Sequence, residues 1–284
     1  MLRERLVLVA DRILKDDAFD DAVTYLCTNI PAVFKQEQRL VRALGDFGAF
    51  ATVMCAASLG SPSGAQFTLA AVQAVVVPAG WISSRRTRAL IDWLELEHAA
   101  ARCLPGGDHR ERPWSLNGWL IAAVERLTET YLVAASPWRI TATGEMPEVK
   151  PTVTNMMRGG VSWFLGNAQE LPAASEEVRM FLGHAPGFPL LLDLLLAARR
   201  GTCGATGCKF SRKATAQAYG VSRAHITALL ARAERLNFLK RDGARVVLSD
   251  LTIQNVQRDL AYQLAFVVLW LEMTSGPDTA GMAL

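Results

Sequence analysis

The stretch YGVSRAHITALLARAE (residues 219–234) reverses the chain between two helices and continues as the second of them. Gly220 stands at the reversal, where the left-handed backbone conformation favours glycine. Ser222 is a good N-cap for the longer helix, and Asn237 can end it. The apolar residues of this helix recur at three- and four-residue spacing and share one face: Val221, Ile226, Leu229, Leu230, Ala233 and Leu236. The pattern predicts a short helix, a turn and a longer helix.

A hairpin signal follows the longer helix. Asp242-Gly243 is typical of a tight turn and lies between the β-prone runs FLK (238–240) and RVVL (245–248). Ser249 or Asp250 then caps a closing helix over about 251–273, and a strongly apolar helix over about 188–199 precedes the whole arrangement. Helix, helix-turn-helix, hairpin and helix is the order of a winged helix-turn-helix domain.

A second stretch with the same rhythm, GWISSRRTRALIDWLE (residues 80–95), lies earlier in the chain. Ile82-Ser83 aligns with Val221-Ser222 and Phe67 with Phe210, at offsets of about 140 residues that indicate one internal duplication. The boundary falls in ASPWRITATGEMPEVKP (135–151), so we predict repeats over 1–137 and 138–284. The remaining predicted helices are 2–28, 33–45, 47–59 and 119–135 in the first half, and 152–166 and 175–183 in the second.

With the apolar face of the second copy buried, Arg223, Ala224 and Thr227 face outward. Near the start of a recognition helix, an arginine can bind guanine through two hydrogen bonds, and Thr227 can meet a thymine methyl. Basic and hydroxyl residues beside this helix suit phosphates or the adjacent minor groove. The predicted DNA contacts of this copy are Ser211, Arg212, Lys213, Ser222, Arg223, His225, Thr227, Lys240, Arg241 and Arg245.

The first copy carries more hydrogen-bond donors. Aligning Ser83 with Ser222 turns Thr87, Leu90, Ile91 and Leu94 inward and places Arg86 at the edge. Its hairpin, LPGGDHRERPWS (104–115), has Gly106-Gly107 at the turn. The predicted DNA contacts of this copy are Ser83, Ser84, Arg85, Arg86, Arg88, His109, Arg110 and Arg112. Asp92, Glu95 and Glu97 make the far end of the helix acidic, so only its first turns suit a phosphate-lined groove.

The second half, over about 188–270, resembles the winged-helix domains of bacterial transcription regulators of the multiple-antibiotic-resistance (MarR) type. Those regulators usually work as homodimers whose terminal helices pack together and set two recognition helices one DNA turn apart. Here the resemblance implies a mainly α fold with small β-hairpin wings, in which tandem winged helix-turn-helix domains form an intramolecular pseudodimer. Such a chain spans successive major grooves, roughly 34 Å apart, on an asymmetric double-stranded site. Whether it acts as a monomer or a homodimer stays open.

In the related regulators a small aromatic effector binds between the dimerisation part and the DNA-binding part. Four tryptophans near the predicted hinge either line such a pocket or pack the two halves together: Trp114, Trp119, Trp138 and Trp163. No residue identifies the ligand. Cys203 and Cys208, each beside glycines, are either plain loop thiols, or a redox sensor or metal half-site.

Composition limits the other readings. Apolar residues make up 51% of 284, and 30 basic residues stand against 27 acidic ones, so basic surface must be local. The odd number of cysteines, five, and the absence of a signal peptide predict a cytoplasmic protein. The longest apolar stretches, 47–60 and 260–273, are shorter than the roughly 20 residues of a membrane span.

The sequence predicts no enzyme, cofactor or metal site. The histidines lack metal-ligand spacing: His98, His109, His184 and His225. Two alternatives to a transcription regulator stay open. A plasmid replication initiator also resembles tandem winged helices in one chain, and winged helices can instead dock protein partners without binding DNA.

Overall fold

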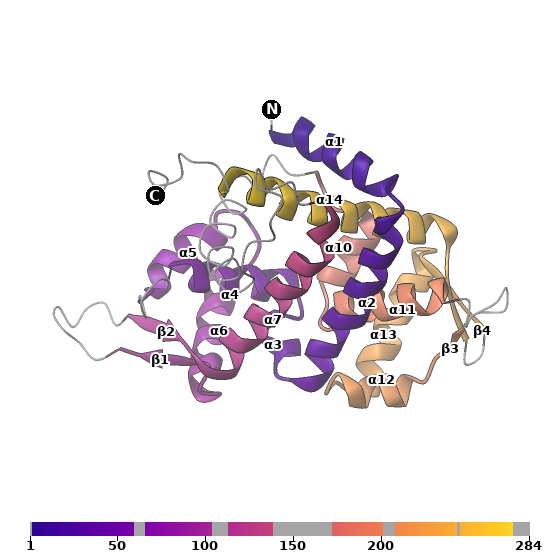
Figure 1. The fold of residues 1–284 in the computed structure, drawn as a ribbon. Coiled ribbons are helices and arrows are strands. Elements are labelled where there is room, and N and C mark those ends of the chain that lie inside the picture. Colours follow the sequence, from indigo (N-terminus) through magenta and orange to yellow (C-terminus); the bar gives the residue numbers. More distant parts are fainter. Residues whose placement is uncertain are drawn as a thin grey trace.

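The computed structural model describes residues 2–59, 66–103, 113–138, 172–200, 208–242 and 245–274. These residues form a mainly helical protein with two small antiparallel sheets, as predicted (Figure 1). A connected hydrophobic core runs from the N-terminal helix to the last one. Within the described ranges, none of the helices combines the length and apolar character needed to cross a membrane.

The elements up to residue 138 begin with a helical part and continue into a helix-turn-helix and a hairpin. They are α1 (Leu2–Leu14), α2 (Ala18–Gln36), α3 (Leu40–Leu44), α4 (Phe47–Leu59), α5 (Leu69–Val76), α6 (Ser84–Leu96), β1 (Ala100–Arg102), β2 (Trp114–Leu116), α7 (Gly118–Ala134) and the 3₁₀ helix η1 (Ser136–Trp138).

The elements from residue 172 onward also include a helix-turn-helix followed by a hairpin and a closing helix. They are α10 (Glu176–Leu182), α11 (Gly187–Arg199), β3 (Cys208–Lys209), α12 (Arg212–Ala218), α13 (Arg223–Arg235), β4 (Leu239–Asp242), β5 (Arg245–Leu248) and α14 (Asp250–Thr274). We call α4 to α7 the first unit and α11 to α14 the second unit. The predicted helix over 152–166 lies outside the described residues.

The two units join through long helices. α1 runs along α14 at the top of Figure 1, and α2 packs against both α7 and α11. Polar bonds cross between the halves as well: Arg5 pairs with Glu272 at 3.3 Å, and Tyr131 Oη donates to Gln263 Oε1 at 2.6 Å. The two hairpins lie at opposite ends of the molecule, β1–β2 on the left of Figure 1 and β4 on the right.

The predicted bounds of the first two helices are wrong. We expected helices over 2–28 and 33–45, but the chain breaks between α1 and α2 and then stays helical through Pro31. The break is stabilised by Asp16, whose carboxylate accepts a hydrogen bond from Ala18 N at 2.9 Å. Pro31 removes a backbone hydrogen bond, but the residue is buried in the core, and this apolar burial offsets the loss.

The local signals of the second helix-turn-helix are confirmed. Ser222 Oγ accepts from His225 N at 3.1 Å, and Gly220 has φ +64°. Asn237 follows the end of α13 and has φ +61°, the left-handed conformation expected of a residue that ends a helix. Leu236 is the exception on the predicted apolar face, since it is 38% exposed. The chain turns at Asn237 toward the hairpin, and Phe238 enters the core in its place.

The sheets place each hairpin against its helix-turn-helix. In the second unit the strand order is β3-β5-β4, with Asp242 opposite Arg245 at the predicted turn. Gly243 of that turn lies outside the described residues. In the first unit β1 pairs with β2, and Phe67 exchanges two backbone hydrogen bonds of 2.8 Å with Trp114. The residues before α5 and before α12 therefore both add an edge to their hairpin.

Candidate nucleic-acid interface

α6 presents the face that its sequence predicts. Ser83 caps the helix by accepting from Arg86 N at 3.3 Å. Its inner residues Thr87, Leu90, Ile91 and Leu94 are buried. The outer residues Ser84, Arg85, Arg88 and Ala89 are exposed, while Asp92 is half-buried. The inner face fixes the rotation of the helix, so the arginines of its first turns point away from the core.

The three arginines of α6 have different surroundings. Arg86 Nη2 donates to Asp46 Oδ2 at 2.5 Å. Asp46 is buried, and it also accepts from Ala49 N at 3.2 Å. Arg86 therefore anchors α6 to the start of α4. By contrast, the structure gives the side chains of Arg85 and Arg88 no hydrogen bond or ion pair with another described residue.

The outer face of α13 is smaller. Arg223, Ala224, His225 and Ala228 are exposed, and the side chain of Arg223 has no polar partner among the described residues. Thr227 is half-buried, and its hydroxyl donates to the carbonyl of Arg223 at 2.9 Å. Its hydroxyl proton is therefore engaged within the helix. The exposed polar side chains at the start of this helix are therefore Arg223 and His225.

On the second hairpin, Lys240 is exposed, but Arg241 is held by the protein. Its Nε and Nη2 both donate to Glu234 Oε2, with Nε at 2.7 Å, and its backbone N donates to Glu234 Oε1 at 3.0 Å. These hydrogen bonds lower the pKa of Glu234 below its ordinary value. Glu234 thus ties β4 to α13. We did not predict this role from sequence, because no local pattern marks a carboxylate as the partner of a strand arginine.

Ser211, Arg212 and Lys213 lie together at the start of α12, as predicted. Ser211 Oγ caps the helix by accepting from Ala214 N at 3.2 Å, and Lys213 is exposed. Arg212 is half-buried at a cavity of about 150 Å³ between α12, α13 and the hairpin. The lining residues are Phe210, Arg212, Leu230, Glu234, Arg241, Arg245 and Val246. The lining therefore includes three arginines and one glutamate, and Arg241 is already paired with that glutamate, Glu234.

The predicted contacts of the first hairpin, His109, Arg110 and Arg112, lie outside the described residues. At its base, Arg102 Nε lies 3.0 Å from Glu95 Oε1, and the guanidinium stacks on Trp114 at 4.7 Å. Glu95, part of the acidic end of α6, is therefore partly neutralised.

The tryptophans predicted near the hinge have separate environments. Trp114 is buried beneath the first hairpin, and Trp119 packs edge to face on Trp93 with ring centroids 6.5 Å apart. Trp138 is buried, and its Nε1 has no hydrogen-bond partner among the described residues. Trp163 lies outside the described residues, as does Cys203. The cavity described above is lined by none of these rings, so the effector pocket stays a prediction.

Comparison with protein-family models, with curated proteins and with solved structures finds no match to this chain. Its function therefore has to be argued from its own geometry. In the described ranges, no group of three His, Cys, Asp or Glu side chains is placed to hold a metal ion. What the two units share is a capped helix beside a hairpin, with exposed arginines in its first turns that have no polar partner among the described residues.

Proposed function

We propose that this chain is a sequence-specific transcription regulator that binds double-stranded DNA with two winged helices, the first and second units. The observation that carries the proposal is the state of Arg85, Arg88 and Arg223. Each lies in the first turns of a helix whose opposite face is buried, and none has a described polar partner. Cationic groups presented in this way at the start of a recognition helix reach base edges in the major groove.

The proposed contacts differ between the units. α6 offers two guanidinium groups, which suit guanines, whereas α13 offers Arg223 beside small side chains that allow close approach. The α12 start and the second hairpin add phosphate contacts through Lys213 and Lys240. The two half-sites of the target therefore need not match. Affinity should fall steeply with salt, because phosphate contacts release counterions.

The proposal treats the two units as copies within one chain that act as an intramolecular pseudodimer. Its support is the shared order of elements and the packing of α1 on α14 and of α2 on α7 and α11. In this arrangement one chain supplies both reading helices. A homodimer would impose a palindromic site, and a fused pair is free of that constraint.

Selection from random duplex DNA at low salt tests the proposal. We expect an enriched asymmetric site bound by one chain, with one half relaxed by Arg85→Ala/Arg88→Ala and the other by Arg223→Ala. The matched control is Arg3→Ala/Arg12→Ala, which removes the same charge from exposed positions on α1. If no sequence is enriched at low salt, the regulator proposal is wrong and docking of a protein partner becomes the better explanation. A palindrome bound by two chains would exclude the pseudodimer.

A further inference from the structure

The segment from Lys35 to Arg39 connects α2 to α3 and contacts both units. We call it the α2–α3 joint. Its second-unit side begins with Gln38, whose Nε2 donates to the carbonyl oxygens of Gln217 at 2.7 Å and Ala218 at 3.1 Å. These carbonyls belong to the last turn of α12. The Gln217 carbonyl also accepts from Gly220 N at 3.3 Å, so Gln38 supplies a further donor to the end of this helix. Gln38 therefore caps a helix 179 residues away in the chain.

Lys35 contacts the end of α12 through Asp193 and the Tyr219 ring. Its Nζ donates to Asp193 Oδ1 at 2.7 Å, and Tyr219 Oη donates to Asp193 Oδ2 at 2.6 Å. The ammonium also lies 5.3 Å from the centre of the Tyr219 ring. Tyr219 is fully buried and is the C-cap of α12. The joint therefore contacts the backbone of this short helix through Gln38 and the side chain at its end through Lys35.

Close packing of Gln38 against Gly220 is a further contact between the joint and the second unit. A Cβ at Gly220 would lie 2.7 Å from Gln38 Oε1 and 3.0 Å from Gln38 Cβ. Gln38 therefore packs against the turn between α12 and α13, at Gly220. The chain continues from there through Val221 and the N-cap Ser222 into α13. Any shift of the joint relative to the second unit would move the turn that sets the direction of α13.

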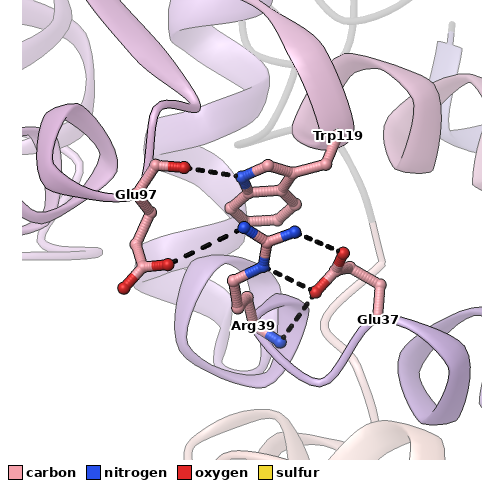
Figure 2. A network of polar contacts seen from close by, with 4 residues as sticks. All are labelled: Glu37, Arg39, Glu97 and Trp119. Carbon is pink, nitrogen blue, oxygen red and sulfur yellow. Dashed lines mark hydrogen bonds and ion pairs between the residues drawn. The ribbon is translucent and has the colours of Figure 1, made fainter.

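Arg39, at the end of the joint, contacts the first unit (Figure 2). Arg39 makes two hydrogen bonds with the carboxylate of Glu37, at 2.8 and 2.7 Å, which hold its guanidinium in one orientation. The guanidinium then stacks on Trp119 at 4.3 Å and lies 3.8 Å from Glu97 Oε2. Trp119 Nε1 donates to the carbonyl of Glu97 at 3.0 Å. Glu97 is the C-cap of α6, so Arg39 contacts the end of the first reading helix and the start of α7.

We propose that Gln38 and Arg39 are positioning residues that set the separation of α6 and α13, so that the protein recognises its two half-sites at a single spacing. The proposal rests on the proposed function and adds a property of the target. Adjacent side chains of one short segment hold the two helix-turn-helix elements, and α2 anchors that segment in the core. When the separation of α6 and α13 is fixed, both helices cannot bind half-sites at another spacing at the same time. The gain in affinity from the second half-site is then lost.

A measurement of the distance between α6 and α13 tests the positioning role without DNA. Spin labels are attached at Ala89→Cys and Ala228→Cys, exposed on the outer faces of α6 and α13, with Cys103, Cys203 and Cys208 replaced by serine. The remaining thiols stay inert because burial raises the pKa of Cys27 to about 12 and that of Cys55 to about 11. We expect a narrow distance distribution in this protein and a broad or shifted one after Gln38→Ala or Arg39→Ala. The control Arg5→Ala, which breaks an exposed bond between the halves far from the reading helices, should leave it narrow.

A spacing series then tests the consequence for DNA. The selected half-sites are placed on duplexes at spacings that differ by single base pairs, and affinities are measured by fluorescence anisotropy. For the unsubstituted protein, half a helical turn away from the optimum should lower affinity by about 100-fold or more, toward that of one half-site. For Gln38→Ala this penalty should shrink to less than about tenfold, with unchanged affinity for an isolated half-site. Equal spacing profiles or equally narrow distances in both proteins would overturn the positioning role and leave the proposed function standing. Absence of all DNA binding would overturn both.

Discussion

Arg85 and Arg86 are neighbours in the chain, and replacing each by alanine should have opposite consequences. Arg85 is exposed and has no described polar partner, so Arg85→Ala should change the free energy of unfolding by less than about 0.5 kcal/mol. On the proposed function it removes one contact to a base. The expected loss of affinity is about 1–3 kcal/mol, or roughly 5- to 150-fold.

Arg86→Ala should act on stability instead. Its hydrogen bond to Asp46 joins a side chain that is 57% exposed to one that is 12% exposed. A hydrogen bond to a charged group contributes about 1.5–3 kcal/mol when buried, and an exposed ion pair less than about 1 kcal/mol. For this half-exposed pair we expect a loss of about 1 kcal/mol, which lowers Tm by roughly 2–4 °C in a protein of this size. Affinity for DNA should change little, because Arg86 is already occupied.

Thermal unfolding and fluorescence anisotropy at fixed salt measure the two effects on the same preparations. Asp46→Asn is the matched control, since it weakens the same pair from the other side and should reproduce the fall in Tm. The double variant Arg86→Ala/Asp46→Asn should cost less than the sum of the single changes. If Arg86→Ala lowers affinity as much as Arg85→Ala while Tm is unchanged, sorting the arginines by their protein partners is wrong.

Two further changes test the fold around the site. Gly220→Ala should lower the free energy of unfolding by about 1–2 kcal/mol because the backbone there is left-handed, and by a further amount because the new Cβ would meet Gln38. The control is Gly80→Ala, where φ is +72° and nothing lies within 4 Å of the new Cβ. Urea unfolding of this variant should show the backbone cost alone. Burial raises the pKa of Asp259 above its ordinary value, although Ser175 donates two hydrogen bonds to it. Its protonated form is favoured in the fold, so its contribution to stability is greatest below the pKa of an unfolded aspartate and is lost as pH rises through the folded pKa. Asp259→Asn should therefore remove this dependence. The unfolding free energy of the unsubstituted protein, measured relative to that of Asp259→Asn, should rise as pH falls from 7 to about 4, and a constant difference would contradict the assignment.

The parts of the site that depend on neighbours in sequence were predictable. A period of 3.6 residues predicted the buried faces of α6 and α13, and a serine before each helix predicted its cap. Glycine at the second turn and Asn237 after α13 were predictable because few other residues adopt a positive φ. The break between α1 and α2 was not, because a short turn such as Asp16 to Ala18 gives a weaker local signal than the helical pattern on either side of it.

By itself the sequence determined where α6 and α13 begin, which face each buries and which side chains face outward, because these depend on contacts within a few residues. Tertiary structure alone decided which of the α6 arginines have a partner among the described residues. The sequence placed Arg86 at the edge of the outer face but gave no partner for it, and in the structure it meets Asp46 from 40 residues away, whereas Arg85 and Arg88 meet no described polar partner. It also decided that Gln38 and Arg39, unremarkable in sequence, lie between the two units. Ion pairs and caps of this kind depend on packing between distant segments, which no local pattern encodes.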